Sequence, residues 1–186
     1  MRMFSCRRRE ALVHDEPLFR RILGSRFDQL PLPLQRLHDT RSQAVFSGRC
    51  DITGGASWPA HVLSLFVGLP RPAGDVPVNV SILYDGNRET WTRRFDTKRM
   101  QSRLTERNGK LVEAVGPVQL SFALEVIDGA ILWTAVHARA FGLPLPLSWF
   151  RRVAAREAVE NGRYTFDVRA ELPLIGLLVH YRGWLE

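Results

Sequence analysis

Between Val76 and Ala140 the chain alternates apolar and polar residues, and short turn-forming dipeptides interrupt the alternation. A period of two places every second side chain on the same face of a β-strand. The alternation is clearest over 118–127. Dipeptides that favour tight hairpins lie between the runs, at Asp85-Gly86, Asn108-Gly109 and Asp128-Gly129. The pattern therefore predicts consecutive antiparallel strands joined by short turns.

Other segments add further elements to this meander. Apolar stripes at helical spacing, with a proline or a capping residue at their start, predict helices from residue 15 or 16 onward, over 32–38, between 57 and 68, and over 148–160. Alternating runs predict strands near 43–52, 76–84, 91–95, 99–107, 111–115, 118–127, 130–141, 163–170 and 177–185.

The expected fold is mainly β, in the α+β class. It is a single antiparallel sheet, strongly bent or closed into a barrel of eight or nine strands, with N-terminal helices and one or two short inserted helices. A calycin-like barrel and a helix-grip fold both fit. The terminal strand, with no long helix after it, counts against the second. We expect a flexible N-terminal leader over residues 1–14 and one β-rich domain over residues 15–186.

Composition narrows the cellular setting. The 186 residues include two cysteines, Cys6 and Cys50, which lack the spacing of a zinc site or a disulfide framework. No apolar run is long enough to cross a bilayer, and the N-terminal arginines precede no apolar signal region. These features predict a cytoplasmic protein without a membrane span.

The net charge is +7, and only two of the 26 basic residues, Lys98 and Lys110, are lysines. A nucleic-acid surface would gather lysines and arginines in one stripe with aromatic residues between them. Here the arginines are scattered along the chain, which favours solubility and codon bias as the origin of the charge. We therefore do not expect a nucleic-acid partner.

Sequence motifs exclude several classes of enzyme. The chain has no P-loop, no dinucleotide-binding glycine motif, no HExxH, no GxSxG and no CxxC. The five histidines are far apart and lack the local spacing of metal ligands. We expect neither a metal nor a cofactor.

Polar residues interrupt apolar strand faces at a few positions. Arg93 lies between Trp91 and Phe95 on one face, and Glu113 lies on an apolar face of a later strand. A buried charge costs several kcal/mol unless it is paired, so these two residues are candidate partners across the sheet. An aromatic neighbour could add a cation–π contact to the arginine. The arrangement fits either polar groups that orient a ligand in a cavity or a structural ion pair.

Four more polar side chains share this character. Ser102 and Tyr181 lie on apolar strand faces, and His38 follows apolar residues on the face of a short helix. Packing or capping accounts for His38 as well as a functional role does. Glu157 is a weaker candidate, placed on the inner face of the helix expected over 148–160.

Several short sequence segments resemble those of a bacterial family of unknown function, DUF4166. They are Leu34-Gln35-Arg36-Leu37-His38, Trp91-Thr92-Arg93-Arg94-Phe95, Glu113 with Gly116-Pro117, Gly142-Leu143-Pro144-Leu145-Pro146, and the stretch from Leu172 to Leu185. The resemblance covers roughly residues 17–185. It carries no activity, but it implies an accessory metabolic role, because family members stand alone or follow a saccharopine-dehydrogenase-like oxidoreductase domain. An oxidoreductase partner domain is therefore one expectation.

Three functions follow as hypotheses. The first is a non-enzymatic module that binds a small apolar molecule in a cavity, using Trp91, Arg93, Ser102, Glu113, Tyr181 and His38. The second is a cyclase- or isomerase-like enzyme in which Glu113 or His38 moves a proton. The third is an interaction protein that uses its basic surface.

Overall fold

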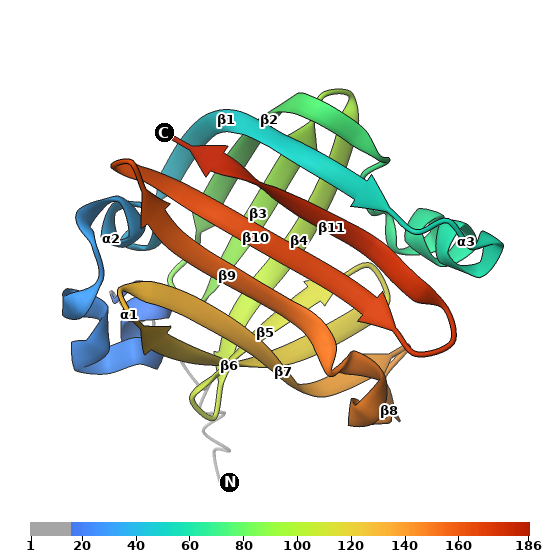
Figure 1. Cartoon of the computed structure of the whole chain (residues 1–186). Helices are drawn as coiled ribbons and strands as arrows, with labels where there is room; N and C mark the ends of the chain where they lie inside the picture. Colours follow the sequence, from blue (N-terminus) through green and yellow to red (C-terminus); the bar gives the residue numbers. More distant parts are fainter. Residues whose placement is uncertain (1–15) are drawn as a thin grey trace, which may run out of the picture.

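The computed structural model describes residues 16–186, which form a closed antiparallel β-barrel with helices at both ends (Figure 1). The leader expected over residues 1–14, Cys6 and the start expected for the first helix at Asp15 lie outside the described residues. The N-terminal helical elements are α1 (Leu18–Leu23), the 3₁₀ helix η1 (Gly24–Gln29) and α2 (Leu32–His38). The inserted ones are α3 (Trp58–Val67) and the 3₁₀ helix η2 (Leu147–Phe150).

The strands follow the chain order around the barrel. They are β1 (Gln43–Gly54), β2 (Ala73–Tyr84), β3 (Arg88–Phe95), β4 (Lys98–Arg107), β5 (Lys110–Val115), β6 (Val118–Ile127), β7 (Ala130–Ala140), β8 (Leu143–Leu145), β9 (Arg152–Glu160), β10 (Arg163–Leu172) and β11 (Gly176–Leu185). Ten of them close the ring, because β7 pairs with both β6 and β9, while β8 pairs only with the end of β7.

The expected mainly β fold is confirmed, and the strand count is higher than the eight or nine expected. Two segments account for the difference. The proline-rich stretch after Phe141 contributes β8, and the segment expected as a helix over 148–160 forms η2 and then β9. The helix prediction was wrong because β9 pairs along its length with β10 and in part with β7, and these ladder bonds override the helix propensity of an alanine-rich segment.

Turn chemistry explains why the meander forms. Asn108, Asp128 and Asn161 all have positive φ, near 50°, and each precedes a glycine that also has positive φ. Such a pair matches the tight turn whose twist fits antiparallel strands. The Asn161-Gly162 pair therefore joins β9 to β10 as a hairpin, where a helix end was expected.

The seam between β1 and β11 closes the barrel. Gly183 faces Cys50 across this seam, and a Cβ atom on Gly183 would lie 2.2 Å from the carbonyl oxygen of Arg49. A Cβ on Gly48 would meet the carbonyl oxygen of Trp184. The two strands approach this closely only because glycine occupies both positions.

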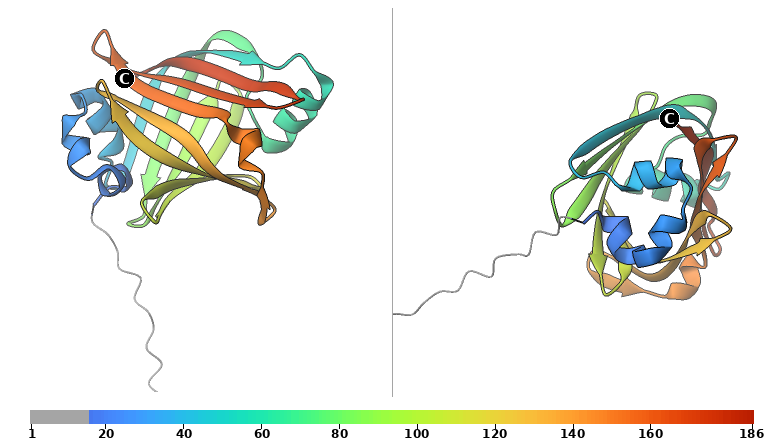
Figure 2. Two further views of the ribbon diagram at one scale, coloured as in Figure 1. Left: turned by 60° about the horizontal axis from the view of Figure 1, so that its bottom comes forward. Right: turned by 90° about the vertical axis from the view of Figure 1, so that its left-hand side faces the viewer.

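The N-terminal helices fill one end of the barrel, as the right-hand view of Figure 2 shows. Their apolar faces point inward and bury four side chains completely: Leu18, Phe19, Leu34 and Leu37. Burial of each such side chain stabilises the fold by roughly 2 kcal/mol. The other end carries α3 and the turns that follow β7 and β10 (Figure 1). Ser57 caps α3 by accepting a hydrogen bond from the backbone of Ala60, and Gly68 ends the helix in the left-handed region. The N-terminal helices therefore fill one end of the barrel, whereas α3 and two turns lie at the other.

Candidate functional site

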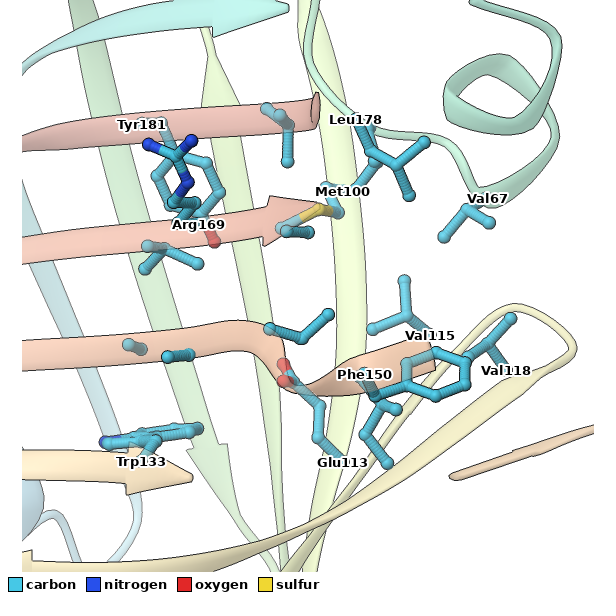
Figure 3. A pocket seen from close by; sticks show the side chains of 18 of the residues that line it. Val67, Met100, Glu113, Val115, Val118, Trp133, Phe150, Arg169, Leu178 and Tyr181 are labelled. Carbon is cyan, nitrogen blue, oxygen red and sulfur yellow. The ribbon is translucent and has the colours of Figure 1, made fainter. Parts of the chain in front are cut away.

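A cavity of about 540 Å³ lies inside the barrel, on the side away from the N-terminal helices. Its walls come from α3, η2 and ten strands, β2 to β11, and most of the lining side chains are apolar. Figure 3 shows several of them around the space, including Val67, Val115, Val118, Trp133, Phe150 and Leu178. A cavity of this volume and character is typical of a site for a small organic molecule.

One ion pair interrupts the apolar wall. The Nη1 group of Arg93 donates to Ser102 Oγ at 2.8 Å and lies 3.3 Å from Glu113 Oε1, so one guanidinium joins β3, β4 and β5. The guanidinium carbon also lies 4.8 Å from the ring centre of Trp91. The pairing expected between Arg93 and Glu113 is therefore present, and Ser102 lies on the strand between them. We call Arg93 and Glu113 the cavity ion pair.

The cavity ion pair consists of two opposite charges, so its net charge is close to zero. Burial works to lower the pKa of Arg93, but the Glu113 carboxylate and nearby tyrosines outweigh it and raise that pKa. The Nε and Nη2 groups of Arg93 take no partner within residues 16–186, and they are not among the unpaired atoms that are shut off from solvent. Arg93 therefore keeps donors that a ligand in the cavity could use.

Tyr181 also lines the cavity, from β11 (Figure 3). Its ring packs edge-on against Phe95 and Phe166. Burial raises the pKa of Tyr181 to about 12, against the opposing charge of Arg93. The phenol stays protonated at neutral pH and can donate a hydrogen bond.

A second set of polar side chains lies deeper, beneath the N-terminal helices. His38 Nε2 and Glu157 Oε2 are 2.6 Å apart, and both side chains are at most 5% exposed. The imidazole packs on Phe19, with ring centres 3.7 Å apart, and stacks near Trp91. Glu157 also lines the cavity. This contact ties α2 to β9 and joins the helix-covered end to the cavity.

Glu89 completes the deeper set. Its Oε2 accepts a hydrogen bond from Trp91 Nε1 at 2.7 Å, and its Oε1 has no hydrogen-bond partner within residues 16–186. Burial raises the pKa of Glu89, although the Trp91 hydrogen bond and the charge of His38 act in the opposite direction. We call His38, Glu89, Trp91 and Glu157 the inner polar cluster. The raised pKa means that the fold favours the protonated form of Glu89.

Glu89 should make the protein less stable as pH rises. Its pKa is raised in the folded state, so the fold binds this proton more tightly than the unfolded chain does. The stabilisation is complete below the ordinary glutamate pKa of about 4.3 and is lost as pH rises through the folded value. Glu89→Gln keeps a neutral acceptor for Trp91, and we expect a flatter stability profile above about pH 4.3. Urea unfolding across a pH series measures it.

The matched control for Glu89→Gln is Glu125→Gln, on the exposed face of β6. This variant should follow the wild-type profile. Parallel profiles for the wild type and Glu89→Gln would contradict a raised pKa at Glu89.

The structure brings most of the predicted residues together. Trp91, Arg93, Glu113 and Tyr181 line the cavity. Ser102 is not among the lining residues but bonds to Arg93. His38 is not among them either, and it reaches the cavity through Glu157.

Sequence reasoning missed two residues and misplaced one. Glu89 shares the inward face of β3 with Trp91 and Arg93, so the same alternation that marked Arg93 also marks Glu89. Tyr164 lies on the inward face of β10, and burial followed by interaction with Glu157 raises its pKa well above the ordinary tyrosine value. Glu157 was expected on a helix, and it lies on β9.

Metal binding and thiol chemistry find no support among the described residues. Residues 16–186 contain no cluster of three or more His, Cys, Asp or Glu side chains that could hold a metal ion. Cys50 is a buried free thiol on β1, and burial, followed by the charge of Asp51, raises its pKa to about 11. This shift disfavours the reactive thiolate. No helix within residues 16–186 combines the length and hydropathy needed to cross a bilayer.

Comparison with known proteins supports the resemblance noted in the sequence. No curated protein matches the chain. A family model described as a domain of unknown function, DUF4166, matches residues 30–185, which include all the strands and both clusters of polar side chains. The chain therefore belongs to the DUF4166 family.

Proposed function

We propose that this protein binds a small, largely apolar molecule inside the barrel and does not itself catalyse a reaction. The observation that carries the proposal is the cavity of about 540 Å³, whose mainly apolar wall is interrupted by a few polar groups, namely two arginines, two glutamates and two tyrosines: Arg93, Arg169, Glu113, Glu157, Tyr164 and Tyr181. Binding cavities combine a mainly apolar wall with a small number of placed polar groups that fix orientation. The family association and the barrel fold are both compatible with a binding module.

The charges around the cavity favour an uncharged ligand. Arg93 is already paired with Glu113, and a second carboxylate, Glu157, also faces the space. An anionic head group would meet the Glu113 and Glu157 carboxylates, while the two guanidiniums that line the cavity, Arg93 and Arg169, are already engaged by Glu113 and Glu171, which costs free energy in a poorly solvated site. A ligand with an apolar body and one neutral acceptor, such as a ketone, ester or alcohol oxygen, could instead accept a hydrogen bond from Arg93 or Tyr181.

Filling the cavity should abolish binding of an apolar fluorophore. Ala155 lines the cavity from β9, and Ala155→Phe adds a ring that projects into the space. We expect the uncharged probe N-phenyl-1-naphthylamine to bind the wild type with an increase in fluorescence and to bind Ala155→Phe at least tenfold more weakly. A fluorescence titration measures both affinities.

The control for Ala155→Phe is Thr134→Phe, which adds the same ring to the exposed face of the neighbouring strand β7. This variant should bind the probe as the wild type does. Equal affinity of all three proteins would place the probe outside the cavity and remove the main support for a binding module.

An acid–base enzyme is the second candidate, and one contact favours it. Glu157 lines the cavity and is hydrogen-bonded to His38, which does not line it. Such a pair can hold or move a proton. Glu157 suits this role better than Glu113, because the Glu113 carboxylate is engaged by Arg93. If a ligand extracted from the purified protein changes its mass or retention time on incubation with wild type but not with Glu157→Gln, the enzyme is favoured over the binding module.

A further inference from the structure

Exposed apolar side chains gather at the open end of the barrel. Thirteen large apolar side chains are exposed within residues 16–186, and nine of them belong to α3, the β7–β8 turn, β8, η2 and the β10–β11 turn. We call these nine the mouth rim: Trp58, Val62, Leu65, Phe66, Phe141, Leu143, Leu147, Trp149 and Leu174. An exposed apolar cluster of this size marks an interaction surface more often than chance exposure does.

The rim residues lie around one opening, although they come from separate parts of the chain. The rings of Phe66 on α3 and Phe141 after β7 are 6.0 Å apart. Ser57 and Ser64 donate hydrogen bonds to the carbonyl oxygens of Ile175 and Leu178, which holds α3 against the β10–β11 hairpin. Figure 1 and the left-hand view of Figure 2 both show α3, β8 and this hairpin at the end opposite the N-terminal helices. The cavity lies directly behind the rim, since Phe66, Phe141 and Leu174 also line it.

Two rim residues are held in a backbone conformation that is unfavourable for them. Phe141 and Leu174 have φ angles of 51° and 65° and are 72% and 107% exposed. Asparagine or aspartate occupies the other non-glycine positions with positive φ, such as Asn108 and Asp128. A bulky apolar residue in this backbone region costs free energy, and the burial of these two exposed side chains offsets little of that cost. The fold thus places apolar side chains at the tips of two turns where polar residues would be more stable.

The segments that carry the rim residues contain charges of one sign only. The segments 58–72, 139–151 and 172–176 contain no aspartate or glutamate. They contain Arg71, Arg139 and Arg151, which are exposed and form no ion pair within residues 16–186. Glu171, at the border of the rim, is engaged by Arg152 and Arg169. The rim segments themselves therefore carry a net positive charge.

We infer that the mouth rim docks on the surface of a bilayer that contains anionic phospholipids. Protruding tryptophan, phenylalanine and leucine side chains insert at the boundary between headgroups and acyl chains, and the three arginines contact lipid phosphates. Separate apolar tips around an opening suit a deformable lipid surface better than a flat protein interface. Docking in this orientation places the cavity mouth against the bilayer, where apolar molecules concentrate. The inference rests on the rim residues and does not depend on the proposed ligand.

Vesicle sedimentation tests the docking. The full chain is mixed with vesicles of phosphatidylglycerol and phosphatidylcholine, or of phosphatidylcholine alone, at low and high salt. We expect binding to the mixed vesicles, much weaker binding to pure phosphatidylcholine, and a loss of affinity at high salt. The triple variant Arg71→Gln, Arg139→Gln, Arg151→Gln should lose about fivefold in partitioning for each arginine, on the order of a hundredfold in total.

Two further variants separate apolar insertion from charge. Trp58→Ser, Leu143→Ser, Leu174→Ser should lose at least tenfold in partitioning, whereas a control triple variant of exposed arginines elsewhere, Arg36→Gln, Arg103→Gln, Arg107→Gln, should keep most of it. Ala155→Phe should still bind vesicles even though it no longer binds the fluorophore, so the two proposals can fail separately. Absence of wild-type binding to mixed vesicles, or an equal loss in the control variant, would overturn the docking.

Discussion

Replacing Arg93 with leucine is expected to destabilise the protein by about 3–5 kcal/mol, because it leaves the Glu113 carboxylate in the cavity wall without a partner. The side chains of Arg93 and Glu113 are only 11% and 15% exposed, so water compensates little for the lost contact. Arg93→Leu also frees Ser102 from its hydrogen bond. Urea unfolding gives the loss as a change in the free energy of unfolding.

The double variant Arg93→Leu, Glu113→Leu should recover most of this loss, since it removes both charges together. Arg94→Leu is the matched control, because Arg94 is the next residue on the same strand and its side chain is exposed. That variant should change the free energy of unfolding by no more than about 0.5 kcal/mol. If Arg93→Leu behaves as Arg94→Leu does, Glu113 does not depend on Arg93 and the description of the cavity ion pair is wrong.

The second large effect is expected at His38. His38→Leu removes the partner of Glu157, whose side chain is 5% exposed, and should lower the free energy of unfolding by about 3–5 kcal/mol. The same change weakens the contact between α2 and β9, so protection from hydrogen exchange should fall first in the N-terminal helices. Urea unfolding and amide hydrogen exchange measure the two effects.

Adding Glu157→Gln to His38→Leu should restore at least half of the lost stability, because an amide carries no charge that needs a partner. His180 provides the comparison. Its imidazole lies 2.9 Å from the Asp167 carboxylate, but the aspartate is 51% exposed. His180→Leu should therefore cost about 1 kcal/mol or less. Equal losses in the two single histidine variants would show that burial of the inner polar cluster does not matter.

Local sequence patterns predicted much of the fold. The period-two runs located the hairpins from β2 to β7, and the apolar stripe over 32–38 matches α2. These elements depend on neighbours in sequence, such as the Asn108 and Asp128 turns. β9 was missed because its conformation depends on pairing with β7 and β10, which no local pattern reports.

The same distinction applies to the candidate site. Arg93 and Glu113 could be paired in advance because each stands alone as a charge on an apolar strand face. The partner of His38 could not be found in this way, since Glu157 is 119 residues distant and its strand was expected as a helix. The mouth rim could not be predicted from the sequence either, because its residues come from separate segments that meet only after the barrel closes.

Native mass spectrometry of the purified chain, before and after organic extraction, tests the proposed binding function most directly. A bound apolar molecule should appear as an adduct on the wild type and on Thr134→Phe, and it should be lost from Ala155→Phe and from extracted protein. The extracted compound should be uncharged and carry at least one hydrogen-bonding oxygen. A protein without an adduct that also fails to bind the apolar fluorophore, or an adduct retained by Ala155→Phe, would contradict the proposal.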